Sequence, residues 1–414
     1  MAAALRGFCA LWALAALFTQ TPAEAQIASA DALPLSRFEP RLLGDVRLRY
    51  ETADDDRFAD ASHAVTLRLR LGAEVRVAPH THILAEFEGV GAPLDGYDDG
   101  VGPAQNRPLI PDAEIAELNR FQLSTSLAPR SQITLGRQRL SLNDERFIGG
   151  VAFRQNEQTF DGVWAHVTPF GAATLDVGYI RRVNRFFSRR SPIGRFRGDS
   201  FVLHAEAPSP IGRLGAFHYA LDLEVGEGAG RNSAASSQTS GARLSGRWHA
   251  DRFSLFWNGV YAVQRDWADN PADYTAQYWV AEGAADAGDF RLTLRSETLG
   301  AQSAGAFQTP LGTNHAFQGS ADLFLVTPAE GVVDRSAALT WRLGSFGALR
   351  GVAASARYHR FQADRGDSRY GQEIDVAMRA KLYGAAVSIE YASYYADAFA
   401  ADSRRLWVTA ERPF

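Results

Sequence analysis

Apolar and charged residues alternate along many stretches of this chain, and no other feature of the sequence constrains its fold as strongly. Residues 65–71 and 217–225 show the alternation most clearly, and it recurs at residues 46–50, 290–295 and 374–379. Successive side chains of a strand point to opposite faces, so strict alternation predicts strands with one apolar and one polar face. We find no sustained helical period in the sequence.

The lengths of the connections indicate which class of β protein these strands build. Short turns are predicted near residues 78–80, 128–131, 168–172, 209–213, 249–252, 284–289, 344–348 and 381–385. Longer polar stretches alternate with them, at residues 52–63, 91–114, 141–159, 182–199, 226–239, 265–272, 298–332, 362–371 and 395–403. Transmembrane barrels have short periplasmic turns, longer extracellular loops and an even number of strands. The sequence therefore predicts an all-β chain, a transmembrane antiparallel β-barrel of about 18 strands (about 16 is the alternative), in a single domain at residues 42–414.

The N-terminus has the features of a secretory signal peptide. One arginine precedes an apolar stretch at residues 8–18, which is too short to span a bilayer, and a small-x-small cleavage site ends at Ala25. We expect residues 1–25 to be removed and residues 26–41 to form a short periplasmic leader. The only cysteine, Cys9, lies in the apolar stretch, so the mature chain forms no disulfide. The expected location is the bacterial outer membrane.

Composition excludes several classes of function. The 43 Lys+Arg residues nearly balance 47 Asp+Glu residues, whereas a nucleic-acid-binding protein needs a basic surface. Lys381 is the only lysine, so arginine carries almost all of the positive charge. The sequence contains no nucleophile, phosphate-binding or paired-cysteine motif and no ligand set with the spacing of a known metal site. We expect no catalytic residue, no cofactor and no metal.

Strand parity decides where the arginines point. An arginine that faces lipid at the middle of a bilayer costs about 2–4 kcal/mol, so arginines that alternate with apolar residues should face an aqueous lumen. Rings of arginine select anions, and guanidinium groups bind carboxylates bidentately. The structural alternative is that most of them pair with wall carboxylates such as Glu86, Glu88 and Glu297. The channel-lining candidates are Arg47, Arg49, Arg68, Arg70, Arg76, Arg243, Arg247, Arg291, Arg295, Arg342 and Arg379.

A second group of arginines falls in the predicted loop between the seventh and eighth strands. Phe186, Phe187 and Phe196 lie among them. Two interpretations stay open: a vestibule that collects anions by electrostatic focusing, or a clamp for the phosphates of outer-leaflet lipopolysaccharide. The arginines of this group are Arg181, Arg182, Arg185, Arg189, Arg190, Arg195 and Arg197.

Two segments of the sequence resemble the alginate export family of outer-membrane porins. The first runs from LGRQRL at residues 135–140 through NDERF at 143–147 to FRQNEQTFD at 153–161. The second is FQTPLGTNH at residues 307–315, followed by QGSADLFLVTP at 318–328. The charged and amide residues of the first segment form either a self-satisfied plug in the lumen or a contact with the cargo. They are Arg137, Arg139, Asp144, Arg146, Arg154, Asn156 and Glu157.

The resemblance implies an outer-membrane porin that exports an acidic, alginate-like exopolysaccharide through an arginine-lined lumen. Its partners would be the polysaccharide, outer-membrane lipid and lipopolysaccharide, and periplasmic secretion machinery. One alternative is an uptake porin for small anionic nutrients, which keeps the barrel and reverses the direction of transport. Another alternative is a barrel enzyme or adhesin, which needs a lumen sealed by loops. Measurements of conductance and of its ion selectivity separate these hypotheses.

Overall fold

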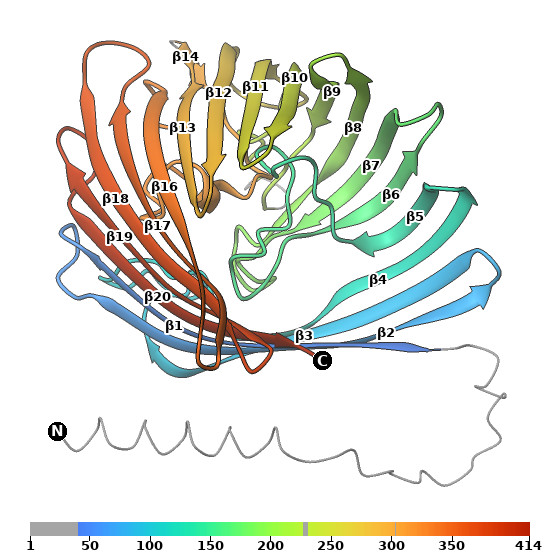
Figure 1. Cartoon of the computed structure of the whole chain (residues 1–414), viewed down its shortest axis with the longest axis horizontal. Helices are drawn as coiled ribbons and strands as arrows, with labels where there is room; N and C mark the ends of the chain where they lie inside the picture. The colour runs from blue at the N-terminus through green and yellow to red at the C-terminus, as the bar shows by residue number, and fades with distance from the viewer. Residues whose placement is uncertain (1–39, 227–230, 303) are drawn as a thin grey trace, which may run out of the picture. The chain divides into compact units, whose positions relative to one another are not determined.

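A closed antiparallel sheet of 18 strands makes up the barrel, as the alternation predicts. The structure is a computed structural model that describes residues 40–226, 231–302 and 304–414. Neighbouring strands pair in chain order, and the last strand closes the ring by pairing with the first (Figure 1). The expected signal peptide and most of the expected leader lie outside the described residues.

The barrel strands, labelled as in Figure 1, are β1 (Arg41–Asp55), β2 (Ser62–Ala78), β3 (Thr81–Gly96), β4 (Ile115–Ala128), β5 (Ser131–Gln138), β6 (Thr159–Val167), β7 (Thr174–Asn184), β8 (Arg195–Ser209), β9 (Gly212–Leu221), β10 (Ser237–Ala250), β11 (Phe253–Asp266), β12 (Thr275–Ala287), β13 (Phe290–Leu299), β16 (Val332–Phe346), β17 (Leu349–Gln362), β18 (Arg369–Leu382), β19 (Ala385–Ala396) and β20 (Ser403–Pro413). A separate two-stranded ribbon consists of β14 (Ala301–Gln302) and β15 (Gly305–Ala306), and one 3-10 turn, η4, spans Asn314–Ala316. None of the helices among these described residues is long and apolar enough to cross a membrane.

Connections on one side of the barrel are short, and those on the other side are long. Only residues 79–80 separate β2 from β3, and only residues 383–384 separate β18 from β19. The longest connections are residues 139–158, between β5 and β6, and residues 300–331, between β13 and β16. Because long loops of such barrels are extracellular, this asymmetry orients the barrel in the membrane.

The two faces of β2 differ in polarity as parity predicts. On β2, Arg68 and Arg70 are 0% and 7% exposed, whereas Leu69 and Leu71 are 42% and 49% exposed. The arginines are covered by loop residues inside the barrel, and the leucines cover the outer surface. The same sequence thus supplies a polar lumen and an apolar face for lipid.

Aromatic side chains mark both ends of the lipid-facing surface. Phe290 and Trp341 are exposed near the short turns, and their rings stack with centroids 5.7 Å apart. Tyr261, Trp279 and Tyr358 are exposed nearer the extracellular ends of their strands. Tyrosine and tryptophan prefer the membrane–water interface, so these residues delimit the part of the barrel that lies in the bilayer.

The main apolar core lies inside the barrel, where loops pack on the inner wall. Ile148 and Phe307, from the two longest loops, are completely buried. Phe147 packs against Phe217 and Tyr278, with ring centroids 5.1 and 5.3 Å away. Burying this apolar surface holds the loops in the lumen, where they set the shape of the passage.

Candidate functional site

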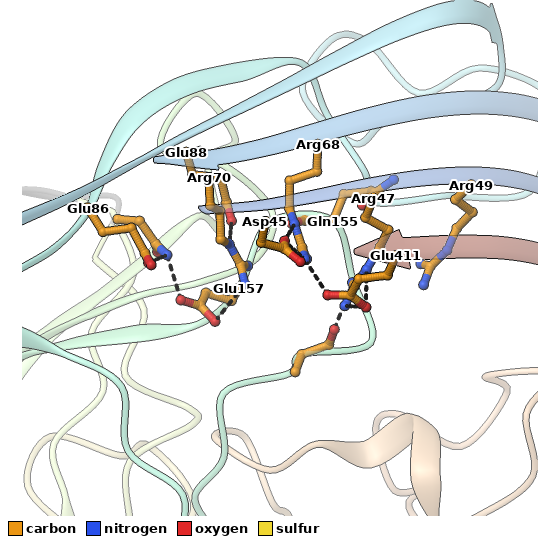
Figure 2. A network of polar contacts seen from close by, with 12 residues as sticks. Asp45, Arg47, Arg49, Arg68, Arg70, Glu86, Glu88, Gln155, Glu157 and Glu411 are labelled. Carbon is orange, nitrogen blue, oxygen red and sulfur yellow. Dashed lines mark hydrogen bonds and ion pairs between the residues drawn. The ribbon is translucent and has the colours of Figure 1, made fainter. Parts of the chain in front are cut away.

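Residues 139–158, here called the first lumenal loop, bind the arginines of β1 and β2. Arg47 donates to Glu411 of β20 at 2.8 Å and to the carbonyl oxygen of Ala152 at 2.9 Å. Arg49 donates to the carbonyl oxygen of Phe153 at 2.6 Å, and its guanidinium carbon lies 4.4 Å from the Phe153 ring centroid. In Figure 2 these arginines project from the strands toward the loop. The wall and the loop therefore form one polar unit.

Carboxylates neutralise the next two arginines of the same wall. Arg68 forms ion pairs with Asp45 and, at 2.8 Å, with Glu411. Arg70 pairs with Glu88 and, at 3.4 Å, with Glu157 of the first lumenal loop (Figure 2). A buried charge that lost its partner would be costly, so these pairs fix the loop against the wall.

Arg146 joins the first lumenal loop to the second lumenal loop, which comprises residues 300–331 between β13 and β16. Its fully buried guanidinium donates to Glu297 of β13 at 2.7 Å. It also donates to Thr309, Asn314 and Gln318 of the second loop, at 2.8–2.9 Å. The two loops are thereby tied into one bridge across the lumen.

Backbone contacts extend the same bridge. The amide of Gly149 donates to the carbonyl oxygen of Leu311 at 3.0 Å, and the Gln158 side chain donates to the same oxygen at 3.0 Å. Thr313 donates to Glu145 at 2.5 Å. These loops are far apart in sequence, and together they occupy part of the lumen and narrow it.

A second ionic cluster lies beside the bridge. Arg154 donates to Glu51 of β1 at 3.2 Å and to Asp322 of the second lumenal loop at 2.6 Å. Nδ1 of His315 lies 2.7 Å from the Asp322 carboxylate. Burial opposes ionisation of Asp322, but His315 and Arg154 outweigh it and hold the pKa of that carboxyl well below its usual range. Asp322 is therefore an anion that balances Arg154.

A cavity of about 460 Å³ opens between the lumenal loops and the segment after β7. Its lining includes the side chains of Arg154, Arg185, His315 and Asp322. Apolar and amide side chains complete the wall, among them Phe186, Phe187, Phe196, Gln308 and Asn314. The cavity combines aromatic surface with fixed cations, a lining suited to a small organic anion.

Arg185 is the cation of this cavity that lacks a carboxylate partner among the described residues. Its guanidinium carbon lies 4.7 Å from the Phe187 ring centroid and 4.4 Å from that of Phe196. One nitrogen donates to the carbonyl oxygen of Ile193 at 2.9 Å, and Nε is buried without a partner. Burial lowers the pKa of Arg185 to about 10, so the group remains cationic at neutral pH.

The other arginines of the 181–197 segment surround the extracellular ends of β7 and β8. Arg181 pairs with Asp199 at 3.1 Å, and Arg182 with Asp161 at 3.5 Å. Arg190 donates to the carbonyl oxygen of Glu114 at 2.6 Å. The backbone of Arg197 pairs with Glu224. No carboxylate lies within ion-pair distance of Arg189 or Arg195 in the part of the chain that the structure describes.

The remaining channel-lining candidates lie on other strands, except Arg76 of β2, and most of them are paired. Ion pairs join Arg243 to Asp144, Arg291 and Arg342 to Asp286, Arg295 to Glu282 and Glu297, and Arg379 to Glu390. Arg247 stacks on the Phe256 ring, with its guanidinium carbon 4.8 Å from the centroid. Arg76 lies near the short-turn end of β2. The structural alternative, pairing with wall carboxylates, thus describes most of these side chains.

The remaining charged and amide residues of the first resembling segment lie either in the barrel wall or in the first lumenal loop. Arg137 pairs with Asp161 at 2.7 Å in the wall. Arg139 pairs with Glu157, and Asn156 donates to the carbonyl oxygen of Phe186 at 3.3 Å. Glu157 also accepts from Asn119 of β4 at 2.6 Å. The first lumenal loop is therefore satisfied largely by its own residues and by the wall.

Several residues of the cavity have no signal in the sequence pattern. His315, Asp322 and Gln308 belong to the second lumenal loop, where no alternation exists to indicate which side chains face the passage. They lie in a long connection and within the second resembling segment, but neither fact indicates which of its side chains line the cavity. Long connections of barrels are where inward-folding segments arise.

Comparison with known proteins gives likeness in fold. No family model and no curated protein matches the chain. The outer-membrane protein OpdK of Pseudomonas aeruginosa superposes with a TM-score of 0.67 at 15% identity, over 90% of this chain and 98% of that one. Acinetobacter baumannii OccAB2 superposes with a TM-score of 0.67 at 14% identity, over 91% of this chain and 98% of that one. A structure of P. aeruginosa OpdK with vanillate superposes with a TM-score of 0.64 at 14% identity, over 90% of this chain and 98% of that one.

These likenesses confirm the barrel fold and, through it, the expected outer-membrane location, since the barrel is that of outer-membrane porins. The expectation of an alginate export porin is wrong: the similar structures are OpdK and other Occ proteins. The physical reason lies in the two segments that carried the resemblance. Both form the lumenal loops, and their contacts with each other and with the wall narrow a barrel for any cargo. They indicate architecture and not a polysaccharide.

Proposed function

We propose that the chain is an outer-membrane channel for the uptake of small organic anions. The observation that carries the proposal is the Arg185 guanidinium, held between two phenylalanine rings at a cavity of about 460 Å³ without a carboxylate partner among the described residues. An anion that enters the cavity gains a charge-assisted hydrogen bond without displacing an existing ion pair.

The paired arginines elsewhere in the barrel have a structural role in this proposal. Arg47, Arg49, Arg68 and Arg70 hold the first lumenal loop, while carboxylates cancel most of their charge. Unpaired cations at the extracellular opening then dominate the field that an arriving solute meets. Arg185, Arg189 and Arg195, which have no carboxylate within ion-pair distance among the described residues, form the vestibule in this proposal and concentrate anions by focusing.

The phenylalanine rings narrow the substrate class further. Phe187 and Phe196 offer flat apolar surface beside Arg185, so a solute with one carboxylate and an aromatic or apolar body fits both. The OpdK structure with vanillate, itself a small aromatic carboxylate, supports this class. Arg247, stacked on Phe256 on the lumenal side of β10, would bind the anion next, nearer the periplasm.

Single-channel recordings test the proposal. The purified protein in a planar bilayer should be anion-selective in a potassium chloride gradient, and benzoate should interrupt the current at lower concentration than benzyl alcohol. In Arg185→Gln, the concentration of benzoate for half-block should rise about tenfold, the value of one charged hydrogen bond. Arg365→Gln is the matched control, because it removes the same charge from an outer-loop arginine that already faces Glu330 at 3.7 Å.

Two results would overturn the proposal. One is cation selectivity of the wild-type channel. The other is equal block by benzoate in wild type and Arg185→Gln, which would show that the cavity does not bind the anion. Uptake is tested separately in cells, where deletion of the gene should slow growth on an aromatic acid as sole carbon source, and Arg185→Gln should restore growth less well than the wild-type gene.

A further inference from the structure

Two arginines stand side by side on the lipid-facing surface of β16 and β17. Arg335 and Arg360 are direct register partners. Their chain neighbours Asp334, His359 and Phe361 are completely buried on the lumenal side, with Asp334 and His359 bonded to each other. Because successive side chains alternate, Arg335 and Arg360 point away from the lumen, and both are exposed.

This pair lacks the partners that arginines elsewhere on the outer wall have. Residues directly opposite in an antiparallel pair have Cβ atoms about 5 Å apart, and like charges there repel. Among the described residues, no carboxylate lies within ion-pair distance of either guanidinium, and the Gln362 amide oxygen accepts from Arg335 at 3.4 Å. By contrast Arg404, on the same face of β20, pairs with Asp54 at 3.6 Å. The pair therefore consists of two exposed cations that no carboxylate of the described residues neutralises.

The position of the pair along the strands places it at the outer edge of the bilayer. Tyr358 is the next outward-facing residue of β17 on the membrane side of Arg360, and it belongs to the extracellular aromatic belt. Ala337 follows Arg335 in the same way on β16. Guanidinium groups one residue pair beyond an interfacial tyrosine lie at the level of lipid headgroups.

An apolar groove of about 780 Å³ continues from Arg335 toward the middle of the membrane. Trp257, Leu294 and Tyr358 wall it, and its floor includes Gly259 and Gly283. A Cβ added at either glycine would meet no atom closer than 3.9 Å, so the groove is open space above the strands. Its lining suits a hydrocarbon chain, and the arginine pair lies at its headgroup end.

We propose that Arg335 and Arg360 bind a phosphate group of lipopolysaccharide in the outer leaflet and that one acyl chain of the same molecule lies in the groove. Two guanidinium groups offer several N–H donors to one phosphate, and the phosphate charge removes their repulsion. A second copy of this chain, docked by two-fold symmetry on this face, would bring arginine pairs together, so charge complementarity favours the lipid. The site is independent of the lumenal cavity.

Native mass spectrometry of the full mature protein in detergent tests the proposal, with diphosphoryl lipid A as the probe. Wild type should bind lipid A, and Arg335→Gln/Arg360→Gln should bind it about tenfold more weakly, as expected for the loss of charge-assisted bonds. Arg404→Gln, the matched control, should bind like wild type. Lipid A stripped of its phosphates should bind wild type no better than diphosphoryl lipid A binds the double variant.

A second variant tests the acyl chain in the groove. Gly283 has an unstrained backbone and open space above it, so Gly283→Leu should fold and fill the groove. It should weaken binding of lipid A but leave binding of the phosphorylated disaccharide without acyl chains unchanged. Equal binding of lipid A by wild type and the double variant would overturn the proposal. Equal affinity for phosphatidylglycerol and lipid A would overturn it in favour of a general phospholipid site. A dimer that Gly283→Leu abolishes would overturn it in favour of a second copy of the chain.

Discussion

Two of the cross-strand arginine pairs in the described barrel have opposite surroundings. Arg47 and Arg68 are register partners on the lumenal face of β1 and β2, and Arg335 and Arg360 are register partners on the lipid face of β16 and β17. In the first pair, the Glu411 carboxylate bridges both guanidinium groups at 2.8 Å. In the second pair no carboxylate of the described residues takes that place.

The neighbours of an arginine decide its role in this barrel. Arg68 is completely buried, and it stabilises the structure because Asp45 and Glu411 satisfy it. Arg335 is exposed and available, because its own wall supplies only an amide. Arg185 lies between these extremes, since it is enclosed by aromatic rings and has no carboxylate partner among the described residues.

Arg146→Ala should have the largest effect, because it removes the arginine that joins the two lumenal loops to each other and to β13. The substitution leaves Glu297 buried with fewer partners and unties the two lumenal loops, at a cost of about 3–5 kcal/mol. We expect larger and noisier single-channel conductance and a lower temperature for the heat-induced unfolding of the barrel on gels.

The control for this experiment is Arg379→Ala, which breaks an ion pair whose arginine side chain is 68% exposed. Such a pair contributes little, at most about 1 kcal/mol. If Arg146→Ala and Arg379→Ala had the same conductance, the bridge between the loops would not set the passage, and the contrast between buried and exposed arginines would lose its basis.

Glu411→Gln should make the lumenal pair resemble the lipid-facing pair. It removes the carboxylate that bridges Arg47 and Arg68, and Asp45 remains, so we expect a loss of about 1–3 kcal/mol. Denaturant unfolding followed by tryptophan fluorescence measures the loss, because Trp407 on the same strand is completely buried. Addition of Arg68→Leu to Glu411→Gln should recover part of the stability; no recovery would mean that repulsion between the arginines is not the cause.

A pH titration should separate Arg185 from the paired arginines. Burial lowers its pKa to about 10, so its neutral form prevails above that pH, whereas an ordinary arginine stays charged. Block by benzoate should therefore weaken as the pH rises through about 10. In Arg185→Gln the block should be weak at every pH, and a wild-type profile without this decline would place the binding cation elsewhere.

The smallest effect is expected at the lipid-facing pair. In detergent without lipopolysaccharide, Arg335→Gln removes a like-charge contact and should raise the unfolding free energy by about 0.2–1 kcal/mol. Thermal unfolding of wild type and variant, measured side by side, checks the sign. A lower stability of the variant would mean that Arg335 already has a stabilising partner on the protein.

Much of the barrel was predictable because its signals are local. Arg68 and Leu69 are adjacent in sequence, and the two-residue period of a strand suffices to place one in the lumen and one toward lipid. Connection lengths likewise give the strand number and the orientation. Where alternation weakens, prediction weakens too: around residues 334–337 the sequence is Asp-Arg-Ser-Ala, and parity there does not show which of the two charged residues faces out.

The candidate site was only partly predictable, because its contacts join distant segments. The 181–197 segment was recognisable as a basic cluster, but its sequence does not show that Arg185 alone opens on a cavity beside Phe187 and Phe196. Arg146 was recognised as a charged loop residue, while its partners Thr309 and Gln318 are more than 150 residues away in the chain. The resemblance to alginate exporters gave the wrong cargo, because the cargo is selected by contacts between loops that are distant in sequence.

Local patterns of the sequence are enough to specify a barrel and to show which face of most strands is polar, because alternation and turn length depend on consecutive residues. Which arginines are neutralised depends on contacts between segments that are distant in the chain. Glu411 reaches Arg47 because β20 closes on β1, and Glu157 reaches Arg70 because a loop folds into the lumen. A guanidinium group that has such a carboxylate within ion-pair distance is a structural cation, and one that lacks it can serve as a binding site. Closure of the barrel and folding of the loops into the lumen determine which arginines have that partner.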